Sequence, residues 1–123
     1  MPVSQSEHYI SVDIETSGPN PNRYALLSLG SCHVYSPQRE FYVELQPDSE
    51  DALPEALAIS GLSMQQLRNE AVPVKKGLQR FEAWLRDQLE EGESPLFVAF
   101  NAAFDWMFVN DYFHRYLGHN PFG

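Results

Sequence analysis

The sequence predicts a single α/β domain, in which an antiparallel three-strand meander and one parallel strand form a mixed sheet with flanking helices. A β-branched stretch, Tyr9–Gly18, begins the meander and runs into a loop rich in Pro, Gly and Asn. A long helical pattern then separates the meander from the apolar run Leu96–Phe100. With 123 residues, of which 43% are hydrophobic, the chain is long enough for one compact core and too short for two.

The first third of the chain accounts for the meander. Tyr9–Gly18 predicts a strand that leads into the loop Gly18–Asn22. Ala25–Tyr35 is rich in Leu, Val and small residues, and Phe41–Leu45 alternates well enough to pair with it. Ser36–Arg39 has the composition of a turn, so we expect the chain to reverse there.

Two short helices follow the meander. Pro54 opens the first, Glu55–Ile59, because proline suits the first helical position, and Gly61 stops it. Ser63 has the spacing of a capping box and predicts a second short helix that runs through Asn69.

The second half predicts a long helix, a strand and an aromatic helix. The long helix is marked by apolar residues at helical spacing, namely Val74, Leu78, Phe81, Leu85 and Leu89. Gly92 ends it, and Leu96–Phe100 is expected to be a buried strand parallel to the first, because a helix precedes it. Asn101 is a natural N-cap for the helix Ala102–Leu117, which Gly118 ends.

Two carboxylates lie two residues apart on the first strand. Asp13 and Glu15 should share one face, while Val12 and Ile14 pack on the other. Neighbouring carboxylates repel each other and lose hydration, so a cation or protonation must offset that cost. Mg²⁺ or Mn²⁺ suits such oxygen ligands. The alternative is that both side chains are simply solvated at the end of a strand.

Asp105 is the third candidate acid. It falls in the first turn of the aromatic helix, close to the carboxyl end of the preceding strand. Ligands of open α/β sheets gather outside that end, so Asp105 can meet Asp13 and Glu15 there. The alternative role for Asp105 is to compensate the helix dipole.

Composition and net charge limit the binding partners and the cell compartment that we expect for this protein. The net charge is −9, with eight Lys and Arg against seventeen Asp and Glu, which argues against a broad electrostatic grip on a nucleic-acid duplex. The N-terminus shows no targeting pattern and no stretch is long enough to span a membrane, so we expect a soluble, cytoplasmic protein. The single Cys32 excludes an internal disulfide and a thiolate zinc site.

Two motifs occur in order on the expected elements. Asp13–Thr16 lies on the first strand, and Asn101–Asp105 lies at the junction of the later strand with its helix. Together with Ala58–Ser63 between them, they resemble the DEDD family of 3′-5′ exonucleases, which is DnaQ-like and includes ribonuclease T and the proofreading subunit of bacterial DNA polymerase III. The resemblance covers nearly the whole chain and implies a ribonuclease-H-like fold.

The resemblance also implies roles for particular residues. It makes Asp13, Glu15 and Asp105 the catalytic ligands of two Mg²⁺ or Mn²⁺ ions, of which one activates water and the other steadies the leaving 3′ oxygen. The expected partner is the 3′ end of single-stranded nucleic acid or a nucleoside monophosphate. The implied substrate-binding residues are Ile14, Thr16, Ser17, Gly18, Asn101 and Phe104. Core packing is the alternative role for Phe104.

The chain departs from the family pattern in two ways. Phe100 stands where the second motif usually has His, which removes no ligand. The third motif, a later helix with a general-base His and a fourth Asp, is absent from residues 1–123, which suggests a C-terminally truncated domain. We therefore expect an exposed sheet edge at Leu96–Phe100, marginal stability, and homo-oligomers or aggregates formed through that edge.

No other residue clearly replaces the missing groups. Asp111 is six positions after Asp105 and should lie on a different helical face. His114 is expected on the helix surface, and His119 in a loose tail.

The sequence therefore predicts one exonuclease domain over residues 1–123 that holds only the first two motifs. The expected function is that of a metal-dependent 3′-5′ exonuclease acting on nucleic-acid 3′ ends, incomplete as this chain. Two alternatives stay open. One is a non-catalytic module that binds a metal or a nucleotide, and the other is a protein-interaction domain that uses its bare aromatic surface.

Overall fold

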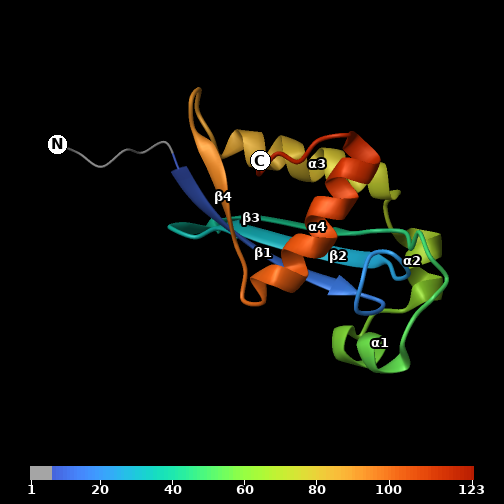
Figure 1. Cartoon of the computed structure of the whole chain (residues 1–123). Coiled ribbons are helices and arrows are strands. Elements are labelled where there is room, and N and C mark those ends of the chain that lie inside the picture. The colour runs from blue at the N-terminus through green and yellow to red at the C-terminus, as the bar shows by residue number, and fades with distance from the viewer. Residues whose placement is uncertain (1–6) are drawn as a thin grey trace.

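A computed structural model describes residues 7–123 and contains a four-strand mixed sheet in the order β3-β2-β1-β4 (Figure 1). The first six residues, on which the expected lack of a targeting signal partly depends, lie outside the described part. β1 (Glu7–Thr16) pairs antiparallel with β2 (Leu26–His33), and β2 pairs antiparallel with β3 (Ser36–Glu44). β4 (Ser94–Val98) lies parallel to β1. The meander and the parallel strand are thus confirmed.

Most helices begin and end close to the residues that the sequence indicates, but the long helix ends at Asp87 rather than running through Leu89 to Gly92. Gly61 ends the first of them with a φ of 72°, and Ser63 Oγ accepts a hydrogen bond from the Gln66 backbone N–H at 3.2 Å at the start of the next. Among residues 7–123, every helix is too short or too polar to cross a bilayer. The helices are α1 (Pro54–Ser60), α2 (Met64–Glu70), α3 (Val74–Asp87) and α4 (Ala102–Leu117).

The main core lies between one face of the sheet and helices α3 and α4, which cross that face in Figure 1. Phe81 of α3 is fully buried in it and stacks with Phe113 of α4 at a ring-centroid distance of 5.9 Å. A smaller core joins the start of β2 to α2 through Leu27, Met64 and Leu67. The helices α1 and α2 lie at the end of the sheet where β1 finishes (Figure 1).

The expected turn at Ser36–Arg39 is wrong. The chain reverses earlier, at Val34 and Tyr35, and His33 pairs with Ser36. This short reversal is accompanied by a register irregularity between Cys32 and His33. Proline has no backbone N–H to donate to a neighbouring strand. Pro37 is tolerated because β3 is an edge strand, where one side of the backbone has no neighbouring strand.

The expected buried strand at Leu96–Phe100 is also corrected. β4 is shifted two residues toward the N-terminus, and only alternate side chains face the core. Phe97 packs against the main core, whereas Leu96 and Val98 are each 38% exposed and Phe100 is fully exposed. β4 is an edge strand, so a continuous apolar run does not bury both of its faces.

The expected loose tail is packed. Asn120 is buried, donates to Asn110 Oδ1 at 2.9 Å and accepts from the Phe122 backbone N–H at 2.9 Å. The Phe122 ring lies 5.2 Å from Phe97 and 6.2 Å from Phe81, between centroids. These contacts close the end of the core between α3 and β4.

Candidate functional site

The strand β1 separates its side chains as the sequence indicates. Val12 and Ile14 are buried in the main core, while Asp13 is exposed and Glu15 is half-buried on the opposite face. Asp105 lies in the first turn of α4 and is only 6% exposed. Two elements that are distant in sequence therefore supply the acids.

The pKa values of Asp105 and Glu15 show that these carboxylates are repelled by neighbouring acids. Burial, followed by the charges of Asp13 and Glu15, raises the pKa of Asp105 from 3.8 to about 6. Burial and the charge of Asp13 also raise the pKa of Glu15. Every ion pair found among residues 7–123 involves other acids, so no basic side chain offsets this repulsion.

The three carboxylates have the oxygen atoms that suit a metal ion, but their spacing does not. Carboxylate oxygens are the ligands that Mg²⁺ and Mn²⁺ prefer. Within the described part of the chain, however, no three His, Cys, Asp or Glu side chains lie close enough to hold a metal ion. Asp13 and Glu15 instead line an open hollow of about 270 Å³, together with Ser28, Gly30 and Tyr42 of the neighbouring strands.

A larger cavity of about 470 Å³ lies beside the acids, between the end of β1, helix α1 and the start of α4. It has the size of a small-molecule site. The structure brings together here five of the six residues expected to bind substrate, namely Ile14, Thr16, Gly18, Asn101 and Phe104. Glu15 lines this cavity as well as the acidic hollow, so the two spaces adjoin.

Two of these cavity residues, Thr16 and Phe104, also have a local structural role, whereas Asn101 does not. Thr16 Oγ1 donates to the Gly18 carbonyl at 2.8 Å, which shapes the loop after β1. Asn101 occupies the N-cap position of α4, but its side chain makes no capping hydrogen bond and is exposed, contrary to expectation. Phe104 packs on Phe108 at 5.3 Å between centroids, so its core role and its cavity role coexist.

Ser17, the sixth expected residue, lies elsewhere. Its side chain is fully buried, donates to the Asp51 carbonyl at 2.9 Å and accepts from the Ala25 backbone N–H at 2.8 Å. Its carbonyl also accepts from the Leu53 N–H at 2.8 Å. With these groups engaged, Ser17 anchors the loop and the start of α1 rather than facing the cavity.

Gly18 is required at this loop by close packing. A Cβ at this position would lie 2.2 Å from Cγ of the Tyr24 ring, which is itself buried. We expect Gly18→Ala to lower the free energy of unfolding by about 1–3 kcal/mol, because the ring and the loop must move apart. Urea unfolding measures this, with Gly61→Ala as a comparison in which backbone strain at φ 72° replaces the clash. Unchanged stability of Gly18→Ala would contradict the packing.

Sequence reasoning missed the wall of the cavity that α1 contributes. Leu53, Glu55, Ala56 and Ile59 line it, and Ile59 is 83% exposed. The sequence does not indicate these residues, because apolar side chains that line a cavity cannot be told from other exposed apolar side chains of a short helix. The one available hint is the family-like segment Ala58–Ser63, which begins on this helix.

The residues considered as substitutes for the missing motif lie away from the acids. Asp111 forms an ion pair with Arg115 on α4. His119 forms a hydrogen bond with Glu82 of α3, and His114 is exposed. None of these side chains lines the cavity or the acidic hollow.

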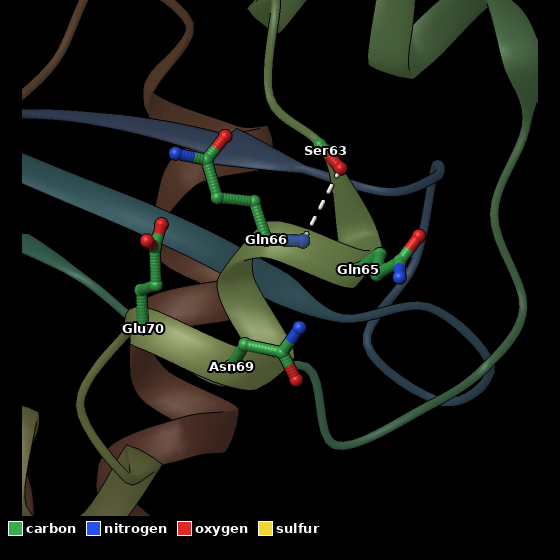
Figure 2. Close-up of a pocket in the computed structure, with 5 residues that line it drawn as sticks. All are labelled: Ser63, Gln65, Gln66, Asn69 and Glu70. Carbon is green, nitrogen blue, oxygen red and sulfur yellow. Dashed lines mark hydrogen bonds between the residues drawn. The ribbon is translucent and has the colours of Figure 1, made fainter.

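A second polar hollow, of about 320 Å³, lies against α2 and is shown in Figure 2. All of its lining residues belong to α2 or to its N-cap, and in the figure their side chains point in different directions around the helix. The Ser63–Gln66 capping contact is the hydrogen bond drawn there. Without converging groups, this hollow is a surface feature of a short helix.

Comparison with known proteins agrees with the two motifs. No family model matches the chain. Over 120 residues, however, the chain is 43% identical to the 3′-5′ DNA exonuclease Cap18 of Escherichia coli, in a match that covers 98% of this chain and 64% of that protein. The chain is thus similar in sequence to a 3′-5′ DNA exonuclease. The resemblance to DnaQ-like enzymes is thereby confirmed, for a chain that spans about two thirds of this relative's length.

Solved structures show that the chain has the expected fold. Exonuclease I bound to the inhibitor BCBP matches with a TM-score of 0.75 at 16% identity, over 98% of this chain and 26% of that one. Escherichia coli exonuclease I bound to a dT13 oligonucleotide matches with a TM-score of 0.74 at 16% identity, over 94% and 25%. At this identity the likeness shows the fold, which confirms the predicted ribonuclease-H-like α/β class.

Proposed function

We propose that this chain is part of a metal-dependent 3′-5′ exonuclease that acts on the 3′ ends of single-stranded nucleic acid. The observation that carries the proposal is that Glu15 lines both the 470 Å³ cavity and the acidic hollow. A terminal nucleotide in the cavity would therefore place its phosphate beside the carboxylates. The sequence relationship to a 3′-5′ DNA exonuclease supports the same function.

In this proposal the cavity and the acids have separate tasks. Ile14 and Phe104 offer apolar contacts to the sugar and base, and Asn101 offers an exposed amide as a polar contact. Asp13, Glu15 and Asp105 are the residues that would hold Mg²⁺ or Mn²⁺. Two divalent ions held there would supply an activated water for attack and stabilisation of the leaving 3′ oxygen.

The acids by themselves form an incomplete catalytic set. Among residues 7–123 no His joins Asp13, Glu15 and Asp105 in a group of metal-ligand spacing, and the expected general base is not found near them. We therefore expect weak or no hydrolysis from these 123 residues, with binding of metal and nucleotide retained. Assembly through the β4 edge and a cytoplasmic location stay predictions.

Titration calorimetry with Mn²⁺, followed by a nucleoside monophosphate, tests the proposal. We expect Mn²⁺ to bind and to strengthen nucleotide binding, because it neutralises the charge that otherwise repels the phosphate. Glu15→Gln should weaken Mn²⁺ binding by about 10-fold or more, since it removes one charged ligand. Glu91→Gln removes the same charge from an exposed loop and should leave binding unchanged. Absence of heat with the native chain would overturn the proposal.

A non-catalytic metal or nucleotide module is the second candidate, and the wide spacing of the acids favours it. The two candidates differ in what happens to a 5′-labelled single-stranded oligonucleotide with Mn²⁺. Shortening from the 3′ end at a rate that Glu15→Gln abolishes supports the exonuclease. Binding without any shortening is expected of both candidates for these 123 residues, so only shortening decides between them.

A further inference from the structure

A cluster of two histidines and one glutamate joins three segments at the end of the sheet where β1 begins. His8 lies on β1, His33 ends β2, and Glu93 lies in the turn before β4. His8 Nδ1 lies 2.8 Å from His33 Nε2, and His8 Nε2 lies 2.9 Å from Glu93 Oε1. None of these side chains lines the cavity or the acidic hollow, so this histidine cluster is independent of the proposed function.

The contacts of the histidine cluster determine which ring nitrogens carry hydrogen at neutral pH. His8 Nε2 faces a carboxylate oxygen, so this nitrogen is protonated, although the pair is not aligned as a regular hydrogen bond. His8 Nδ1 is then unprotonated and accepts a hydrogen bond from His33 Nε2–H. This leaves His33 Nδ1 unprotonated, and it is buried without a hydrogen-bond partner. An unprotonated nitrogen needs no acceptor, so the cluster is stable while both rings are neutral.

A further proton disrupts the histidine cluster wherever it binds. On His33 Nδ1 it creates a buried N–H donor that has no acceptor. On His8 Nδ1 it turns the acceptor of the His33 N–H into a second donor, so the contact between the two rings breaks. Burial, followed by the charges of Arg39 and His8, accordingly lowers the pKa of His33. Among residues 7–123, no charge on α3 or α4 contributes to this shift.

The histidine cluster lies at the start of a strand that has few other restraints. β4 has five residues and is an edge strand, so within the described chain β1 is its one neighbouring strand. Ser94, its first residue, directly follows Glu93 and pairs with Glu7. The contact of Glu93 with His8 therefore adds a side-chain link where this pairing begins. In the described part of the chain the cluster lacks the spacing of metal ligands, so protons are the species to which it responds.

We propose that His8, His33 and Glu93 form an acid-sensitive latch, which holds the start of β4 on β1 while both histidines are neutral and releases it when the pair takes up a proton. Because the pKa of His33 is below its ordinary 6.5 in the folded chain, the closed latch binds a proton less tightly than the open one. Its contribution to stability is complete above pH 6.5 and is lost as the pH falls below that value. Asp105 has the opposite effect in this range, because its pKa is raised.

Nitrogen-15 NMR of the imidazole rings tests the closed latch in the native chain. At about pH 7.5 we expect His8 and His33 to be neutral rings that are both protonated at Nε2. On acidification, His33 should titrate with a midpoint below 6.5. His114, which is exposed on α4, is the internal reference. A His33 ring that is protonated at Nδ1, or that titrates with an unshifted midpoint, overturns the inference.

Amide hydrogen exchange of β4 tests the release. The readout is the protection of the β4 amides in the native chain divided by their protection in His33→Gln, between about pH 7.5 and about pH 5. This ratio cancels the opposite contribution of Asp105, which both proteins share. It should fall with the pH by up to about 10-fold per pH unit, which is the limit for uptake of one proton.

His114→Gln is the matched control for hydrogen exchange, because it removes an exposed histidine from α4 and should keep the native protection at each pH. A ratio for His33→Gln that does not change with pH overturns the inference, as does an equal change in His114→Gln. The NMR titration needs no substitution, so it decides the question even if His33→Gln does not fold.

Discussion

Asp105→Asn is expected to stabilise the metal-free protein and, at the same time, to remove its response to metal. The Asp105 carboxyl is 6% exposed and lies in the field of Asp13 and Glu15, which together with burial raises its pKa to about 6. Above that pH the Asp105 carboxylate is charged in the folded protein, where water hydrates it less well than in the unfolded chain. The neutral amide removes this cost, which we place at about 1–3 kcal/mol after allowing for solvent at the open face of the sheet.

The pH dependence of this effect has a definite sign. Because the pKa of Asp105 is higher in the folded state than its ordinary 3.8, the folded protein binds the proton more tightly. Its contribution to stability is complete below pH 3.8 and is lost as the pH rises through about 6. Asp105→Asn should lack this decline, so the two unfolding curves should diverge most at neutral pH.

Urea unfolding between about pH 4 and pH 8, with and without Mn²⁺, measures both consequences. Mn²⁺ at about 100 times its dissociation constant should stabilise the native chain by about 2.7 kcal/mol, and should stabilise Asp105→Asn much less. Asp111→Asn is the matched control, because Asp111 lies on the same helix and pairs with Arg115 instead. If Asp105→Asn is less stable than the native protein at neutral pH, the charged Asp105 carboxylate does not destabilise the fold and the prediction is wrong.

Phe81→Ala is expected to cause the largest loss of stability. Phe81 is fully buried at the centre of the core, 5.3 Å from Phe41, 5.9 Å from Phe113 and 6.2 Å from Phe122 between ring centroids. It therefore joins α3 to β3, to α4 and to the C-terminal tail. Removing the ring should lower the free energy of unfolding by about 3–5 kcal/mol, through lost burial and the cavity left behind.

The same deletion at Phe100 is the control, because that ring is fully exposed. We expect Phe100→Ala to change stability by no more than about 0.5 kcal/mol. Since small domains are stable by only about 5–15 kcal/mol, Phe81→Ala should lose a large share of the stability and should unfold at a clearly lower temperature. Circular dichroism during heating measures both variants. Equal unfolding temperatures would contradict the placement of Phe81 at the centre of the core.

Much of the candidate site follows from local sequence patterns. The period of two along β1 separates Asp13 and Glu15 from the buried Val12 and Ile14, and Asp105 follows from the start of α4. Five of six expected substrate residues line one cavity, because both motifs lie at element ends that meet there. Ser17 differs because its hydroxyl is engaged by Asp51 and Ala25, partners that no local pattern indicates.

The sequence by itself determined which elements form and where most of them end. Strand alternation, helical spacing and capping residues depend on neighbours within a few positions, so a single chain displays them. Only the tertiary structure decided that alternate side chains of β4 and the Phe100 ring are exposed, and that Phe122 closes the core. Burial depends on which distant segment covers a face, and that information lies in contacts between residues far apart in the chain.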